Sequence, residues 1–187
     1  MEYITLYHGT SSEFKESISQ EGINPRKESS HLGNWSKAPS REDFVYLTDT
    51  YPIYFAFAAL NEVINEDELA KENLLIYKLR VQTDKLYPDE DFIYHLNKKE
   101  NIAISNEECK ELAIKNQKDW ESSLKMLGTV GHYGKISTTQ IISQVELKLE
   151  DQKDLFLVWE GIQPTISIEN KLFCGQRYQE LTESLFN

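Results

Sequence analysis

The first 22 residues constrain the fold most, because a strand pattern, a turn and a helix pattern follow one another without a gap. The alternation over Tyr3–Tyr7 predicts a short strand that runs directly into His8-Gly9-Thr10. Thr10 and Glu13 have the spacing of a helix capping box, and Gly22 is placed to end the helix. We therefore expect a strand, a turn at His8-Gly9-Thr10, a short helix and a glycine stop.

The rest of the chain predicts strands and helices that do not alternate regularly. Strands are expected over residues 44–48, 74–81, 141–149, 154–159 and 165–173, and helices over residues 53–64 and 105–127. A long polar loop is expected over residues 24–43, and an acidic turn over residues 87–92. Because strands dominate the C-terminal part, the pattern indicates the α+β class rather than a doubly wound sheet. The length of 187 residues suits one domain, which we expect to span residues 1–187.

Composition and charge weigh against several function classes. The net charge of −11 repels phosphate backbones and disfavours non-specific nucleic-acid binding. Cys109 and Cys174 form no CxxC pair, so we expect neither a metal cluster nor a disulfide framework. No signal peptide is visible, and no apolar run approaches the roughly 20 residues that span a bilayer. The sequence therefore predicts a cytoplasmic protein with no metal and no membrane segment.

Two short motifs offer groups that can do chemistry. At the end of the first strand, His8 presents an imidazole, Gly9 a backbone without a Cβ, and Thr10 a hydroxyl. Tyr46 lies in the second strand, within Val-Tyr-Leu-Thr-Asp. Taken alone, each motif is also typical of an ordinary strand, so their order along the chain is the informative feature.

This order resembles the ADP-ribosyltransferase superfamily, in the diphtheria-toxin and PARP-like branch whose triad is His, Tyr, Glu. The resemblance is most specific over residues 6–60, in LYHGTSSEFKESISQEGI and FVYLTDTYPIYFAFAAL, and it points to small bacterial or phage stand-alone members. It implies a split β-sheet core with flanking helices. It also implies that NAD⁺ is the co-substrate and that ADP-ribose is transferred.

The resemblance assigns roles to the two motifs. His8 and Gly9 would hold the adenosine-side ribose and the nicotinamide amide, with support from Thr10. Tyr46 would stack on the nicotinamide ring. The other face of that ring would be covered by an aromatic side chain of the following helix, either Tyr54 or Phe57.

The resemblance also places residues 24–43 over the pyrophosphate of NAD⁺. Arg26 and Arg41 in this loop are expected either to pair with the phosphates or to be solvated surface charges.

The third motif departs from the family pattern. Where the family has a glutamate at the start of a late strand, this chain has Thr129, within LGTVGHYGKISTTQII. Three alternatives are open. Thr129 or His132 takes the polar role, Glu146 converges on the site from Gln144-Val145-Glu146, or the acidic turn Asp89-Glu90-Asp91 folds over the site. Because the resemblance links this glutamate to chain elongation, poly-ADP-ribose synthesis is not expected.

The resemblance implies a mono-ADP-ribosyltransferase that modifies a macromolecule, which is a protein, an RNA or a DNA. A compact catalytic domain of this kind is similar to toxins of toxin–antitoxin or phage-defence systems, so an inhibitory antitoxin protein is an expected partner. The alternatives are an NAD-dependent RNA 2′-phosphotransferase, a degenerate NAD- or ADP-ribose-binding module, and an NAD⁺ glycohydrolase.

Overall fold

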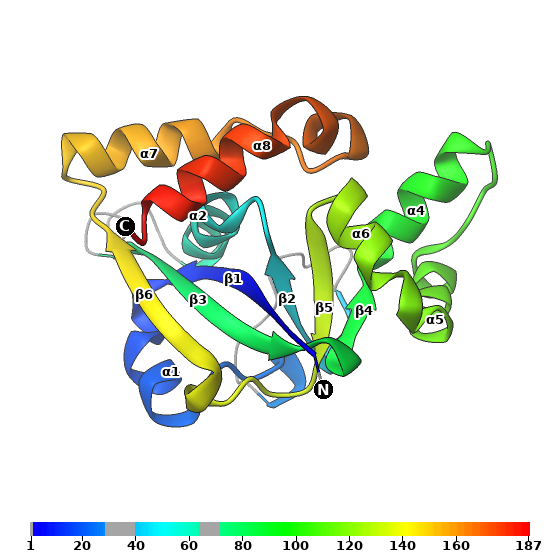
Figure 1. Ribbon diagram of the computed structural model, residues 1–187, viewed down its shortest axis with the longest axis horizontal. Coiled ribbons are helices and arrows are strands. Elements are labelled where there is room, and N and C mark those ends of the chain that lie inside the picture. The colour runs from blue at the N-terminus through cyan, green and yellow to red at the C-terminus, as the bar shows by residue number, and fades with distance from the viewer. Residues whose placement is uncertain (1, 29–39, 64–71) are drawn as a thin grey trace.

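The computed structural model describes residues 2–28, 40–63 and 72–187, and its centre is a six-stranded antiparallel sheet. The strand order is β4-β5-β2-β1-β3-β6, which Figure 1 shows from β4 on the right to β6 on the left. The strands are β1 (Tyr3–Ser11), β2 (Phe44–Thr48), β3 (Leu74–Gln82), β4 (Leu86–Pro88), β5 (Thr129–Tyr133) and β6 (Ile141–Leu147). Together with its helices, this sheet confirms the α+β class.

The sheet is split between β1 and β2. β1 pairs with β3 over nine residues, from Tyr3↔Gln82 to Ser11↔Leu74, whereas β1 and β2 meet in the single pair Tyr7↔Thr48. Two three-stranded halves result, β6-β3-β1 and β2-β5-β4. The expected split β-sheet core is therefore confirmed, and the split runs past His8-Gly9-Thr10.

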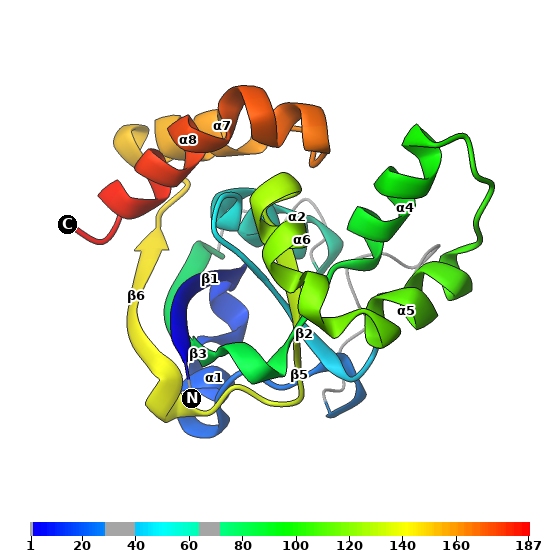
Figure 2. The ribbon, with the colours of Figure 1, turned by 45° about the vertical axis from the view of Figure 1, so that its right-hand side comes forward.

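Helices flank the sheet on both sides and at one edge. They are α1 (Lys15–Glu21), α2 (Pro52–Val63), α4 (Glu90–Lys99), α5 (Asn106–Lys115), α6 (Trp120–Met126), α7 (Gln152–Ile162) and α8 (Ile168–Ser184). α7 and α8 lie together beyond one end of the strands, and α4 and α5 lie at the β4 edge (Figures 1 and 2).

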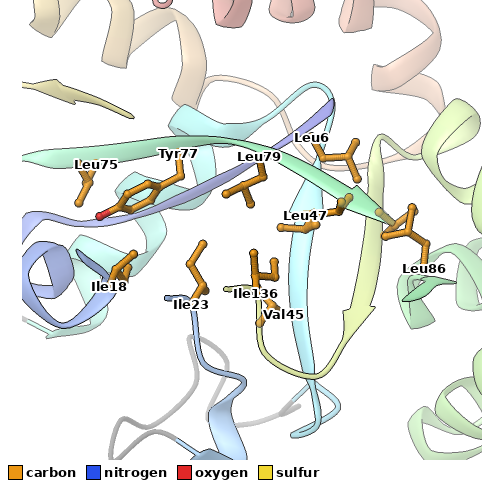
Figure 3. Packing of buried hydrophobic residues seen from close by; sticks show 12 residues of the cluster. Leu6, Ile18, Ile23, Val45, Leu47, Leu75, Tyr77, Leu79, Leu86 and Ile136 are labelled. Atoms are coloured by element: carbon orange, nitrogen blue, oxygen red, sulfur yellow. The ribbon is translucent and has the colours of Figure 1, made fainter. Parts of the chain in front are cut away.

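The two faces of the sheet carry separate hydrophobic clusters. One joins α2 and α7 to the β6-β3-β1 half through Ala56, Leu74, Ile76 and Val158, all nearly inaccessible to solvent. The other contains side chains from both halves of the sheet, and Figure 3 shows them converging. Its labelled members are Leu6, Ile18, Ile23, Val45, Leu47, Leu75, Tyr77, Leu79, Leu86 and Ile136. Apolar burial, rather than a backbone ladder, therefore holds the halves together across the split.

The N-terminal unit differs from its expected form at the turn. His8-Gly9-Thr10 is part of β1, which continues to Ser11, so the expected turn is wrong. The capping box at Thr10 is also wrong, because the Ser11 hydroxyl accepts the hydrogen bond from the Glu13 backbone N–H. The glycine stop is confirmed, since Gly22 follows α1 with a φ of 86°.

Two expected C-terminal strands are wrong, because residues 154–159 lie in α7 and residues 168–173 lie in α8. The apolar run Leu155–Trp159 fits a buried strand and a helix equally well, since periodicity cannot separate the two in a short run. Asp151 and Ser167 decide for helices, because their side chains accept hydrogen bonds from the backbone N–H groups of the first turns.

The expected acidic turn over residues 87–92 is also wrong, because a short strand ends there and a helix begins. Residues 86–88 form β4, and Asp89 caps α4 by accepting a hydrogen bond from the Asp91 N–H at 2.9 Å. The expected helix over residues 105–127 is divided into α5 and α6, and Gly128 follows it with a φ of 87°.

Three further expectations from the sequence concern the polar loop, membrane segments and metal sites. Of the polar loop over residues 24–43, residues 29–39 lie outside the described residues. Among residues 2–28, 40–63 and 72–187, no helix has the length and apolarity that a membrane crossing requires. In the same ranges no group of three or more His, Cys, Asp or Glu side chains is arranged to hold a metal ion.

Candidate functional site

His8 bridges the opening between the two halves of the sheet. Its strand is held on one side by β3, through the pair His8↔Tyr77. On the other side its Nδ1 lies 3.1 Å from the backbone oxygen of Tyr46, and because a carbonyl only accepts, Nδ1 carries the proton and donates. The hydrogen bond therefore joins the His8-Gly9-Thr10 motif to the tyrosine motif, one residue beyond the pair Tyr7↔Thr48.

The His8 imidazole is neutral near pH 7. Burial lowers its pKa below the ordinary value, and the hydrogen bond with the Tyr46 carbonyl offsets only part of this decrease. With the proton on Nδ1, the Nε2 atom of a neutral ring is a hydrogen-bond acceptor. His8 thus offers a ligand hydroxyl an acceptor rather than a positive charge.

Gly9 is required by the packing of α2 on β1. A Cβ at this position would lie 1.9 Å from the Pro52 backbone oxygen and 2.7 Å from the Ala56 backbone nitrogen. The neighbouring Thr10 is buried and paired with Leu75 of β3. The absence of a side chain at Gly9 therefore has a packing reason that does not involve a ligand.

The hydroxyl of Tyr46 is held by a buried ion pair. It lies 2.6 and 2.7 Å from the two carboxylate oxygens of Glu90, to which it donates. It accepts from the backbone N–H of Arg41 at 3.1 Å and from the Arg41 Nε–H at 3.3 Å. The Arg41 Nε also lies 3.2 Å from Glu90 Oε2, and both side chains are at least 94% buried. Tyr46, Glu90 and Arg41 form one unit, which we call the tyrosine clamp.

Gly131 makes room for the tyrosine clamp. On β5 it pairs with Tyr46 of β2 on one side and with Tyr87 of β4 on the other. A Cβ on Gly131 would lie 2.8 Å from Arg41 Nη2 and 2.9 Å from the Phe44 ring. The Arg41 guanidinium crosses this bare position, stacks 3.8 Å above the centre of the Phe44 ring, and donates to the Pro88 carbonyl at 2.9 Å.

The electrostatics of the tyrosine clamp keep the phenol protonated. Burial raises the pKa of Tyr46 well above its ordinary value, and the negative charge of Glu90 raises it further, against the opposing effect of Arg41. Tyr46 is therefore unsuited to act as an acid or a base near neutral pH. What it can offer a ligand is the face of its ring.

Two more carboxylates lie beside the tyrosine clamp at the start of α4. Burial raises the pKa of Asp89 to about 8, with further contributions from the charges of Asp91 and Glu90. The charge of Asp91 reaches α2, where it adds to burial in raising the pKa of Tyr54. Of the two aromatic candidates on α2, Tyr54 is thus the one near these carboxylates, whereas Phe57 packs against the cluster of α2 and α7.

Thr129 lies close to the tyrosine clamp but is not part of it. It starts β5, pairs with Thr48 and is buried. The Ser123 hydroxyl donates to the Thr129 carbonyl at 2.8 Å and accepts from the Asp89 N–H at 3.0 Å. The nearby Thr129 hydroxyl lowers the pKa of Asp89, against the effect of burial. A glutamate at position 129 would place another negative charge beside Asp89 and Glu90, at the cost of like-charge repulsion in a buried place.

The structure does not bring Glu146 or His132 to the same place. Glu146 lies on β6, at the other edge of the sheet, with its carboxylate on Lys15 Nζ at 2.6 Å and on Asn73 Nδ2 at 2.7 Å. His132 is buried on β5, where its Nδ1 lies 3.2 Å from the Gly134 carbonyl. Among the carboxylates considered from the sequence, it is Glu90 that contacts Tyr46.

The two arginines of the polar loop have protein partners. Arg26 donates from Nη2 to the Ser40 carbonyl at 2.8 Å, and Arg41 belongs to the tyrosine clamp. Arg41 is thus a buried ion-pair residue rather than a surface charge. The sequence contained one signal for this pairing, which is an acidic run directly after Pro88 and before an apolar helix pattern.

A cavity of about 680 Å³ lies beyond the other end of the split. It is lined by the first half of β1, by α6 and by α8, including Thr5, Trp120, Gln176 and the partly buried ion pair of Asp49 with Lys171. His8 and Tyr46 are not among its lining residues.

Comparisons with known proteins give a distant likeness among solved structures. No family model matches the chain, and no curated protein matches it. Among solved structures the chain is similar to EcPltA, with 16% sequence identity and a TM-score of 0.40, over 80% of this chain and 79% of that chain.

Proposed function

We propose that this protein is an NAD⁺-dependent mono-ADP-ribosyltransferase acting on a macromolecule. The observation that carries the proposal is the split of the sheet beside His8, where the His8 imidazole and the Tyr46 backbone meet across the opening. The family resemblance over residues 6–60 assigns the dinucleotide to these same two motifs.

The residues of the site fit the chemistry of this transfer. The bond between nicotinamide and ribose breaks, nicotinamide departs, and the ribose carbon bonds to a nucleophilic atom of the acceptor, which loses a proton. The transition state carries positive charge on the ribose, so a neutral imidazole suits it better than a charged one. The protonated phenol of Tyr46 offers a flat, apolar face to the leaving ring.

A second candidate function is a degenerate module that binds NAD⁺ or ADP-ribose without turnover. It is favoured by the neutral Thr129 and by the fact that both carboxylate oxygens of Glu90 already have protein partners. The first function alone requires a macromolecular acceptor. Under that function we also propose an inhibitory antitoxin protein as a partner.

Labelled NAD⁺ separates these possibilities. The protein is incubated with it in the presence of protein extract, RNA or DNA, beside His8→Ala and, as a control, Glu160→Gln in α7. We expect label on one polymer class, a decrease of about tenfold or more in kcat/KM for His8→Ala, and no change for the control. Nicotinamide release without labelled polymer would indicate a glycohydrolase, and turnover only with 2′-phosphorylated RNA would indicate the phosphotransferase. Binding of NAD⁺ without nicotinamide release would support the module and contradict the proposal.

A further inference from the structure

Glu90 reaches Tyr46 because β4 runs beside β5. The pair Pro88↔Val130 aligns the end of β4 with the start of β5, so the next residues along the chain arrive beside Thr129. α4 begins there, and its Glu90 side chain meets the hydroxyl of Tyr46, whose backbone lies on β2, on the other side of β5. A carboxylate thus reaches the tyrosine motif from α4, although β5 itself supplies none.

The hydrogen bonds of the tyrosine clamp leave the Tyr46 ring little freedom. The hydroxyl donates to Glu90 and accepts from two N–H groups of Arg41, which uses its whole hydrogen-bonding capacity. The ring is thereby fixed at its far end, while the backbone of Tyr46 is fixed by β5 and by His8. A side chain held at both ends is pre-organised to receive a flat ligand, because no rotamer entropy is lost on binding.

We propose that Glu90 is a positioning residue for NAD⁺ binding, which acts through the hydroxyl of Tyr46 rather than by contact with the substrate. This inference rests on the proposed function and names a residue that serves it. Glu90 fixes the ring against which the nicotinamide lies, and its negative charge offsets that of Arg41, whose guanidinium carbon lies 5.9 Å from the centre of the same ring. The nicotinamide of NAD⁺ is cationic until it leaves, so the face of an aromatic ring attracts it.

The position of the Glu90 charge at the far end of the Tyr46 ring leads to a prediction about KM and kcat. Because the cationic nicotinamide is bound before the bond breaks, the tyrosine clamp contributes to substrate binding more than to the chemical step. Loss of the clamp is therefore expected to raise KM for NAD⁺ and to leave kcat nearly unchanged.

The test is a double-mutant cycle with Tyr46→Phe and Glu90→Gln, measured by nicotinamide release. We expect each single variant to raise KM about tenfold, which corresponds to about 1.4 kcal/mol of binding free energy, with kcat within about threefold of the wild type. The double variant should be no worse than Tyr46→Phe alone, because Glu90 is proposed to act only through the hydrogen bond that Tyr46→Phe removes. Asp49→Asn is the matched control, since it breaks another largely buried ion pair, with Lys171, and should leave KM unchanged.

Glu90→Gln leaves the buried Arg41 without its counter-charge, so a second variant guards against misfolding. Glu90→Gln combined with Arg41→Met removes both charges and should show the same rise in KM. Three results would overturn this inference but leave the proposed function standing. They are an unchanged KM in an active Glu90→Gln protein, additive effects of the two substitutions in the cycle, and an equal rise in KM for Asp49→Asn. A wild-type protein that neither binds NAD⁺ nor releases nicotinamide would overturn the proposed function and this inference with it.

Discussion

Replacement of Gly9 by alanine tests whether this position is governed by packing. The added Cβ would lie 1.9 Å from the Pro52 oxygen, with the Ala56 nitrogen and the Pro52 carbonyl carbon within 2.9 Å. All three atoms belong to the backbone at the start of α2, so no side chain can rotate to make room. Ordinary contact begins at 3.4 Å, so α2 would have to move away from β1 by about 1.5 Å at this point.

The cost of that movement sets the expected effect. Overpacking of a core costs about 1–3 kcal/mol, and the upper end applies here because a helix backbone must shift. For a chain of 187 residues, about 3 kcal/mol corresponds to a decrease in Tm of about 6–12 °C.

The assay is thermal unfolding followed by circular dichroism, with Gly134→Ala as the matched control. Gly134 has a φ of 75° and no heavy atom within 4 Å of an added Cβ, so alanine there meets only backbone strain of about 1 kcal/mol. A Gly9→Ala protein whose Tm lies within about 2 °C of the wild type would refute the packing argument.

Three further predictions concern charged groups. Arg41→Met should lower the free energy of unfolding by about 3–5 kcal/mol in urea titrations, because Glu90 loses its buried partner, and added Glu90→Gln should restore much of the loss. Between pH 4 and pH 8 the folded protein binds a proton at Asp89 that the unfolded chain does not, since burial raises this pKa from 3.8 to about 8. Wild-type stability should therefore fall as the pH rises through this range, and Asp89→Asn, which preserves the helix cap, should flatten the curve of Tm against pH; parallel curves would contradict this. Lys171→Met removes the ion pair that ties α8 to Asp49, and should speed limited proteolysis of α8; an unchanged cleavage rate would show that apolar packing alone holds the helix.

Local patterns in the sequence predicted the elements that carry the site. The strand over residues 44–48 and the helix over residues 53–64 were predictable because Asp49 to Pro52 separates a short β-branched and aromatic run from a longer Ala-rich one. The C-terminal helices were not, because their apolar residues run together at Leu155–Trp159 instead of recurring at helical spacing. Three large side chains of that run, Leu155, Phe156 and Trp159, are more than half exposed in the folded chain.

The partners within the site could be predicted only in part. The sequence indicated His8 and Tyr46, and it left three alternatives for the polar group of the third motif. It could not choose Glu90, because the contact depends on the pairing of β4 with β5 and on a separation of 44 residues along the chain. The sequence shows Gly131 only as an interruption of the helix pattern, whereas in the structure it leaves space for the guanidinium of Arg41, from the loop before β2.

The single residue pair between β1 and β2 makes this joint the mechanically soft line of the sheet. Bending the sheet at any other joint would disturb three or more backbone residue pairs, whereas here one pair, the His8 hydrogen bond and the apolar cluster resist the motion. We therefore expect relative motion of the two halves to be largest beside the His8-Gly9-Thr10 segment. A ligand that binds at this joint could therefore separate the two halves slightly without disturbing the pairing of the other strands. Among the strands of the sheet, amide hydrogen exchange should be fastest on the facing edges of β1 and β2.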